Sequence, residues 1–234
     1  MECILFGSEM SKLLITTRAD NNVDYIAELT HPLFKDYAER CGADFLVLDN
    51  IAPAEGDDNV AVYRIMQHYD LHDTYERILC LDTDIIINKN SPNIFDYVPE
   101  DKIGCTLEDT VITERIKDRR EAIEHVQKKW KDIGWKSNYI NSGVFLTSRM
   151  HRDIFQSVDG EYWTGRGSDD IHLGYQIHKN GYEIFRLPFQ YNHTGLYSEA
   201  RGGGHDRMNS YFLHYAGGKQ IKEELFYDWN RIYG

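Results

Sequence analysis

Short apolar runs alternate with segments of helical periodicity along the first part of the chain. Residues 12–17 are apolar and β-branched, which favours a buried strand, and residues 45–48 predict another. A helix is expected between them, with Pro32 in its first turn and Gly42 at its end. Its apolar face contains Leu33, Phe34, Tyr37, Ala38 and Cys41. Strand, helix and strand in this order predict a βαβ unit with two parallel strands.

The alternation continues toward an acidic strand end. Residues 62–69 have helical periodicity, and residues 77–81 form an apolar run that is typical of a buried strand. This run leads directly into Asp82-Thr83-Asp84, and residues 85–87 continue in extended form. The sequence therefore predicts a second helix and a strand whose carboxyl end carries two carboxylates.

The second half of the chain keeps the pattern. We expect a charged surface helix at 114–130, a strand at 144–146, a helix at 169–179, and late strands at 183–187 and 211–214. This alternation predicts one Rossmann-like α/β domain over residues 1–234, with a mainly parallel central sheet flanked by helices. Met10 offers a second start, so we interpret residues 1–11 as an N-terminal extension.

Composition and charge narrow the classes of function. The formal net charge of −12 argues against sequence-independent nucleic-acid binding, which needs clustered Lys and Arg. No apolar stretch approaches the ~20 residues of a membrane span, and the start lacks the features of a signal peptide. The four cysteines fit neither a zinc pattern nor a disulfide framework. We therefore expect a soluble, cytoplasmic protein, with a domain of a larger protein as the alternative.

The acidic strand end is the first candidate site. Asp82 and Asp84 can both reach one cation if the backbone turns between them, and oxygen ligands suit Mg²⁺ or Mn²⁺. A surface turn of acidic residues is the alternative, because a D-x-D triplet is a short motif that also arises by chance. Its place after a buried strand favours the metal site.

His214 offers a third ligand at the end of a late strand. A neutral imidazole binds Mn²⁺ well. Gly217 would let backbone amides approach a phosphate, and Lys219 would add a positive charge. The alternative is a hydrogen-bonded structural histidine followed by an ordinary glycine turn.

Four segments in order resemble a known family. They are Leu81-Asp82-Thr83-Asp84-Ile85, Asn141-Ser142-Gly143-Val144-Phe145, Leu187-Pro188-Phe189-Gln190-Tyr191-Asn192 and His214-Tyr215-Ala216-Gly217. The chain resembles the glycogenin-like and bacterial galactosyltransferase-like glycosyltransferases of family 8, which have the GT-A fold. The resemblance implies that Asp82, Asp84 and His214 bind Mn²⁺ (or Mg²⁺) and that Lys219 contacts the diphosphate. In the family, however, this lysine usually comes one residue later.

The resemblance also implies two halves and further donor contacts. Residues 12–110 would bind the nucleotide, and residues 111–234 would bind the acceptor and supply the late metal ligand. The nucleoside would lie against Thr16, Thr17, Arg18 and Asp20. Arg64 would face the nucleotide, although a solvated helix charge is an equal interpretation. Thr83 belongs to the diphosphate site, and Asn141 and Ser142 would lie beside the donor sugar.

Asp169 and Asp170 open a helix and are the candidate catalytic residues. In GT-A enzymes an acidic residue at such a helix start binds sugar hydroxyls or acts on the acceptor. The family pattern is Asp-Gln, so the second carboxylate is a departure, and Asp170 would serve as a general base in an inverting reaction. The alternative is stabilisation of the helix start by capping and by the helix dipole.

The combined prediction is a metal-dependent glycosyltransferase. It would transfer a sugar from a nucleotide diphosphate sugar, by resemblance a UDP-sugar, to a hydroxyl of a glycan or glycoconjugate. One alternative, a sugar-nucleotidyltransferase, would need a glycine-rich basic loop after the first strand, where this chain has no glycine. The other, a non-catalytic module that binds a carbohydrate or a nucleotide sugar, would need neither both carboxylates nor His214.

Overall fold

The computed structural model describes residues 12–19, 23–48, 60–109, 113–198, 204–217 and 219–234. The interpreted extension, residues 1–11, therefore lies outside the described residues. None of the helices in the described ranges has the length and apolarity needed to cross a membrane.

Within these described ranges, six strands form the central sheet, in the order β2-β1-β3-β6-β5-β7. They are β1 (Leu13–Arg18), β2 (Asp44–Leu48), β3 (Arg77–Asp82), β5 (Ile103–Leu107), β6 (Ile140–Ser148) and β7 (Ile184–Arg186). Neighbouring strands are parallel except in the two pairs that β6 forms with β3 and β5. The prediction of a mainly parallel α/β sheet is confirmed, with one reversed strand.

The reversed strand decides which residues meet at the carboxyl edge of β3. The sequence predicts a strand only at 144–146, but β6 extends over nine buried residues. Leu81 is the register partner of Val144, so the residues that precede Val144 lie beside the end of β3. An antiparallel neighbour therefore brings its first residues, not its last, to this edge.

A second, small sheet joins segments that are far apart in sequence. Strand β4 (Ile85–Ile87) pairs antiparallel with β8 (Phe212–His214), and His214 is the register partner of Ile85. Both predicted strands are confirmed. Because Ile85 directly follows Asp84 in the chain, this pairing places His214 beside the Asp82–Asp84 turn.

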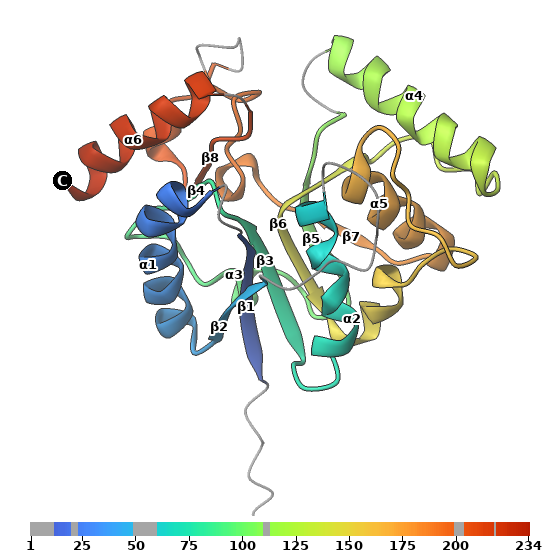
Figure 1. Ribbon diagram of the computed structural model, residues 1–234, viewed down its shortest axis with the longest axis horizontal. Helices are drawn as coiled ribbons and strands as arrows, with labels where there is room; N and C mark the ends of the chain where they lie inside the picture. Colours follow the sequence, from blue (N-terminus) through green and yellow to red (C-terminus); the bar gives the residue numbers. More distant parts are fainter. Residues whose placement is uncertain (1–11, 20–22, 49–59, 110–112, 199–203, 218) are drawn as a thin grey trace, which may run out of the picture.

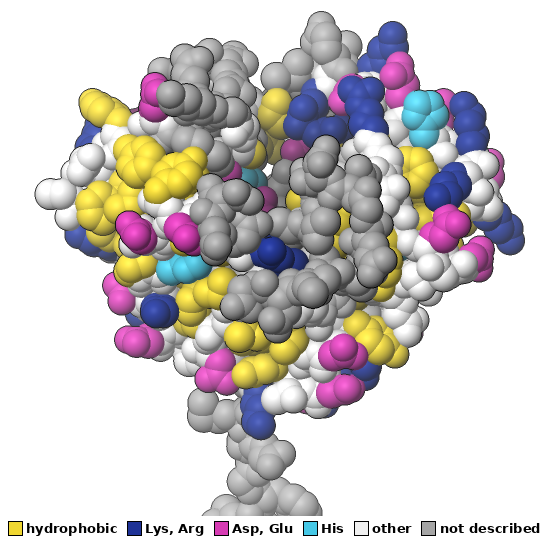
Figure 2. Space-filling model, in the orientation of Figure 1, with side chains coloured by type: hydrophobic (Ala, Val, Ile, Leu, Met, Phe, Trp, Pro, Cys, Tyr) yellow, Lys and Arg dark blue, Asp and Glu magenta, His cyan; other side chains and the backbone are white. Residues whose placement is uncertain are grey.

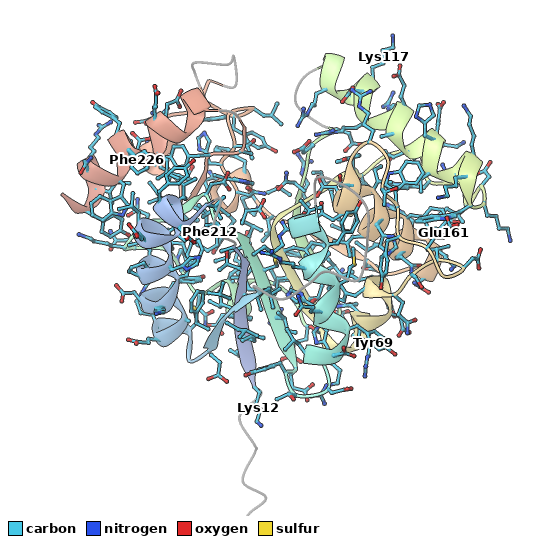
Figure 3. All side chains as sticks on the ribbon, viewed as in Figure 1. Lys12, Tyr69, Lys117, Glu161, Phe212 and Phe226 are labelled. Atoms are coloured by element: carbon cyan, nitrogen blue, oxygen red, sulfur yellow. The ribbon has the colours of Figure 1, made fainter. Side chains whose placement is uncertain are left out.

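Helices cover the two sides of the sheet (Figure 1). They are α1 (Asp24–Cys41), α2 (His68–Leu71), α3 (Ile94–Tyr97), α4 (Thr113–Lys129), α5 (Ser168–Asn180) and α6 (Lys219–Tyr233). Alternate residues of β3 point to opposite faces, since Leu79 and Leu81 pack in the core cluster of α1 whereas Cys80 packs in that of Leu173 on α5. Lys12 lies just before β1 at the amino-terminal edge of the sheet, and Lys117 on the outer helix α4 lies toward the opposite end of the molecule (Figure 3).

Two predicted elements differ from the structure. Pro32 lies inside α1 and not in its first turn, because the buried face continues upstream through Ile26 and Ala27 to a start at Asp24. Burial of this longer face offsets the ~3 kcal/mol cost of an interior proline. Gly42 does end the helix, with φ 67°. The predicted helix at 62–69 is a 3₁₀ helix, Val60–Gln67, which continues into α2.

Candidate active site

Charged residues from β1 and β3 meet at the carboxyl edge of the sheet. Arg18 ends β1, Asp82 ends β3, and the two are register partners. Ligands of open α/β sheets bind at such strand ends. Gly143, the residue before the register partner of Leu81, comes to the same place from β6.

Three side chains form a candidate metal centre. His214 Nε2 lies 3.5 Å from Asp82 Oδ2 and 3.3 Å from Asp84 Oδ1. One potential ligand atom of each of the three residues lies within 4.8 Å of the others. Two carboxylate oxygens and an imidazole nitrogen are donors that Mn²⁺ accepts, and carboxylate oxygens also suit Mg²⁺. The residues expected as ligands thus lie together, in an arrangement that fits one divalent cation.

The close packing of Gly143 against this centre gives a test of its geometry. A Cβ atom at this position would lie 2.3 Å from His214 Cε1 and 2.9 Å from Asp82 Oδ2. We therefore expect Gly143→Ala to displace both ligands and to weaken Mn²⁺ binding by about 10–100-fold, the usual cost of changing a residue that supports metal ligands. Loss of the free-Mn²⁺ electron paramagnetic resonance signal on titration measures this affinity.

A matched control is Gly174→Ala on α5. Its Cβ atom would lie 2.6 Å from the Trp135 ring, so it creates a comparable clash among residues that do not line the site pocket. The control should lower thermal stability and leave the affinity for Mn²⁺ unchanged. Equal Mn²⁺ affinity of Gly143→Ala and the wild type would contradict the assigned metal geometry.

Arg18 is the buried cation of the site. Its guanidinium pairs with Asp82, donates to Asp169 Oδ2 over 2.6 Å and donates to the carbonyl of Val62 over 2.8 Å. Burial lowers the pKa of Arg18, but Asp82 and Asp169 outweigh this effect and hold the pKa above its ordinary value. The sequence places Arg18 against the nucleoside, whereas the structure places its guanidinium between a metal-site carboxylate and a candidate catalytic carboxylate.

Asp169 and Asp170 face the start of β6 from the first turn of α5. Asp169 Oδ2 accepts from the Ser142 hydroxyl over 2.8 Å, and Asp170 Oδ1 accepts from the Ser142 backbone N–H over 2.8 Å. Burial, together with the charges of Asp169 and Glu108, raises the pKa of Asp170 well above its ordinary value. A carboxyl group with a raised pKa can act as an acid or a base nearer neutral pH.

The capping alternative for these two residues finds little support in the hydrogen bonds. The N-cap of α5 is Gly167, with φ 85° and no side-chain cap hydrogen bond. Asp169 and Asp170 follow within the same first turn and bond across to Ser142. Their charges still favour the positive end of the helix dipole, but their hydrogen bonds hold them at the site.

A pocket of about 300 Å³ contains most of the predicted site residues. Figure 2 shows a hollow between the two upper lobes of the molecule, with acidic and histidine side chains visible in it. The predicted residues that line this pocket are Arg18, Asp82, Thr83, Asp84, Asn141, Ser142, Asp169, Asp170 and His214. Val23, Ile26 and Val62 add an apolar wall.

Other predicted residues lie elsewhere. Three predicted residues are not among the described residues that line the pocket: Thr16, Thr17 and Arg64. Thr16 and Thr17 are fully buried and bond to His68 and Thr83 respectively. Arg64 donates to the carbonyl of Ala19, so it packs against the chain after β1 rather than serving only as a solvated helix charge.

The remaining predictions concern the loops. Asp20 lies outside the described residues, as does the side chain of Lys219, whose backbone begins α6. Gly217 is described, with φ 139°, and follows the pocket residue Ala216. Their expected contacts with the nucleotide stay predictions.

Two residues that bear on the site received no role from the sequence. Glu108 directly follows β5, a strand that the hydrophobic pattern did not predict. Asn192 occurs in one of the four resembling segments. In the structure its Oδ1 atom lies 2.8 Å from His214 Nδ1. A polar residue after the apolar run 103–107 is the signal that would have indicated Glu108.

Comparisons with solved structures identify the fold. A glycosyltransferase involved in glycosylation of the major capsid of PBCV-1 matches at 14% identity, 92% of this chain, 99% of its own and a TM-score of 0.60. The galactosyltransferase LgtC, in complex with donor and acceptor sugar analogues, matches at 15% identity, 95% of this chain, 96% of its own and a TM-score of 0.57. This chain has the GT-A glycosyltransferase fold.

The likeness extends to other GT-A structures at the level of fold. The bifunctional glycosyltransferase WbbM matches at 11% identity and a TM-score of 0.61, with 94% of this chain and 47% of its own covered. Comparison by sequence finds neither a family model that fits the chain nor a curated protein that matches it. The GT-A fold and the site geometry are therefore the basis for assigning a function.

Proposed function

We propose that this GT-A protein is a metal-dependent glycosyltransferase that uses a nucleotide diphosphate sugar as donor, with a UDP-sugar as the favoured donor. The observation that carries the proposal is the convergence of Asp82, Asp84 and His214 in the pocket at the carboxyl edge of the sheet. The acceptor is a hydroxyl of a glycan or glycoconjugate. LgtC was solved with donor and acceptor sugar analogues, which supports the same substrate classes here.

Asp82, Asp84 and His214 would hold Mn²⁺ (or Mg²⁺). When bound, the cation supplies a Lewis acid that stabilises charge on the departing diphosphate. Arg18 keeps one oxygen of Asp82 engaged, so that the Oδ2 atom is directed toward His214. Lys219 and the backbone at Gly217 are proposed to contact the diphosphate.

The other side of the pocket would orient the sugars. Asp169 is held by Arg18 and by the Ser142 hydroxyl, so its carboxylate has a fixed direction before substrate binds. Such preorganisation lowers the entropic cost of placing reacting groups. Asn141 and Ser142 line the pocket and are proposed to lie beside the donor sugar. The nucleoside would lie beyond the end of β1, where Arg18 lines the pocket and Arg64 holds the carbonyl of Ala19, whereas Thr16 and Thr17 would support this segment from the interior.

Asp170 is proposed as the general base. Its carboxyl group, which lines the pocket, would take the proton from the acceptor hydroxyl as that oxygen attacks the anomeric carbon and the diphosphate leaves. Direct displacement of this kind inverts the anomeric configuration, whereas full analogy with family 8 predicts retention. Nuclear magnetic resonance of the product's anomeric proton distinguishes the two courses.

The proposal is tested by incubating the protein with a panel of nucleotide sugars, with and without Mn²⁺. We expect Mn²⁺-dependent release of UDP from a UDP-sugar, through slow hydrolysis without acceptor, and loss of release with a chelator. A sugar-nucleotidyltransferase would instead form UTP from a UDP-sugar and pyrophosphate. A binding module would show a thermal shift with the ligand and release no UDP. Absence of both the thermal shift and the reaction with every donor in the presence of metal would refute the proposal.

A further inference from the structure

A chain of buried hydrogen bonds leads from Glu108 to the imidazole of His214. Asn141 Nδ2 lies 2.7 Å from Glu108 Oε1, Asn192 Nδ2 lies 2.7 Å from Asn141 Oδ1, and His214 Nδ1 lies 2.8 Å from Asn192 Oδ1. The four residues are between 0% and 8% exposed. They come from the ends of β5 and β8, the start of β6 and the loop after β7.

Each amide in this chain has a single orientation that satisfies its neighbours. The Gly143 backbone N–H can only donate, and it points at Asn141 Oδ1 over 3.0 Å. An ionised Glu108 can only accept, so the other end of the Asn141 amide must be the nitrogen. The Asn141 oxygen then requires a donor from Asn192, which is its amide nitrogen.

The orientation of Asn192 fixes the proton on the imidazole. Asn192 Nδ2 also donates to Thr106 Oγ1 over 2.9 Å, which agrees with the same orientation. The Asn192 oxygen is therefore the atom that faces His214 Nδ1, so Nδ1 must carry the proton and donate. Nε2 is then the ring nitrogen that faces Asp82 and Asp84.

The Glu108 end of the chain is anchored as an anion. Its Oε2 accepts from Arg115 Nη2 over 2.9 Å and from Arg119 Nε over 2.8 Å, while Oε1 is used by Asn141. Burial opposes ionisation of Glu108, but Arg119 and Arg115 hold its pKa below the ordinary value. Both arginines belong to α4, so this surface helix supports the chain that ends at His214.

We propose that Asn192, oriented by Asn141 and Glu108, is a positioning residue that fixes His214 as the Nδ1–H tautomer and so presents Nε2 to the cation. Histidine ligands of metals generally donate the other ring N–H to a neighbouring group, and loss of that group lowers metal affinity by about 10–100-fold. The role in metal binding rests on the proposed function, whereas the tautomer of His214 follows from the hydrogen bonds alone.

Two substitutions of Asn192 separate positioning from structural support. Asn192→Asp keeps an oxygen acceptor for Nδ1–H but loses both amide donors, and it places a buried charge beside Asn141 Oδ1. Asn192→Leu removes the acceptor. We expect Mn²⁺ affinity close to that of the wild type for the Asp variant and about 10–100-fold weaker for the Leu variant. The Asp variant should be no more thermally stable than the Leu variant, because its buried carboxylate has lost its hydrogen-bond partners.

The control is Gln176→Leu, which removes another buried amide, one that bonds to the carbonyl of Gln156 and does not line the site pocket. It should lower stability without changing Mn²⁺ affinity. Equal loss of Mn²⁺ affinity in both Asn192 variants, or unchanged affinity in Asn192→Leu, would overturn the proposal.

A direct measurement decides the tautomer without a variant at Asn192. Long-range ¹H–¹⁵N spectra of ¹⁵N-histidine-labelled, metal-free protein distinguish the two neutral tautomers, and the His214→Gln variant identifies the His214 signals. Protonation of Nδ1 in the neutral ring is expected, and an Nε2–H ring would refute the inference. If His214 is the Nδ1–H tautomer and the wild type binds no Mn²⁺, the positioning chain stands and the proposed metal-dependent function fails.

Discussion

Asp84→Ala is expected to reduce UDP-sugar turnover by about 10³-fold, because a bound cation contributes several kcal/mol of charge stabilisation and 1.36 kcal/mol corresponds to a factor of ten. Asp84 supplies one of the three converging ligand atoms, and His214 Nε2 lies 3.3 Å from its Oδ1. Its removal leaves one carboxylate and one imidazole for the cation. The measurement is kcat/KM for UDP release at a Mn²⁺ concentration that saturates the wild type and at a much higher one. Excess metal should partly restore the activity of the variant if its metal binding is weakened.

Asp84→Ala removes a metal ligand without an expected loss of stability in the metal-free protein. In the metal-free protein, Asp82 and Asp84 are carboxylates that both approach His214, so loss of one removes repulsion between like charges. We therefore expect the melting temperature without metal to stay equal or to rise, while the stabilisation by added Mn²⁺ disappears. Asp36→Ala, an exposed position on α1, is the matched control and should change neither quantity. Full turnover by Asp84→Ala at low Mn²⁺ would show that the carboxylate is not a ligand.

The sequence predicted the parts of the site that follow local patterns. An apolar run that ends in Asp82 shows a strand end directly, and His214 ends another short apolar run. The resembling segments then connected these positions, although they are 130 or more residues apart in sequence. The hydrophobic pattern also predicted the βαβ start, since β1 is an almost continuously buried run, whereas α1 and β2 each turn one face inward with the period of the element.

What the sequence missed depends on pairing between strands. Nothing in the local pattern of residues 140–148 shows that this strand runs antiparallel to β3, and this reversal is what brings Gly143 beside His214. The run before Glu108 was not predicted as a strand, and the bond of Glu108 to Asn141 joins residues that are 33 positions apart along the chain. Arg18 was expected near the nucleoside, but its partners Asp82 and Asp169 are 64 and 151 residues away along the chain. Long-range ion pairs of this kind have no local signature.

Asp170→Asn is expected to lower kcat by about 10²–10⁴-fold, the usual contribution of a general base, and to make the protein more stable at neutral pH. The raised pKa of Asp170 explains both effects. In the folded protein this carboxyl group binds its proton more tightly than in the unfolded chain, where its pKa is near 3.9. The folded state therefore holds more protons as pH rises from the unfolded pKa to the folded pKa, and stability falls across that window. Asparagine keeps the oxygen that accepts from the Ser142 N–H and removes the cost of ionisation.

The pH dependence of kcat/KM distinguishes a base from a merely structural carboxyl group. A base must be ionised to accept a proton, so the activity of the wild type should fall as pH falls through the raised pKa of Asp170. The residual activity of Asp170→Asn should lack this acidic limb, while its free energy of unfolding, measured by urea denaturation, should exceed that of the wild type above the window. Asp169→Asn provides the comparison: it weakens the ion pair with Arg18 and should lower stability instead. An Asp170→Asn variant that keeps both its activity and its acidic limb would exclude Asp170 as the base and favour retention of anomeric configuration, in which the acceptor is activated by another group.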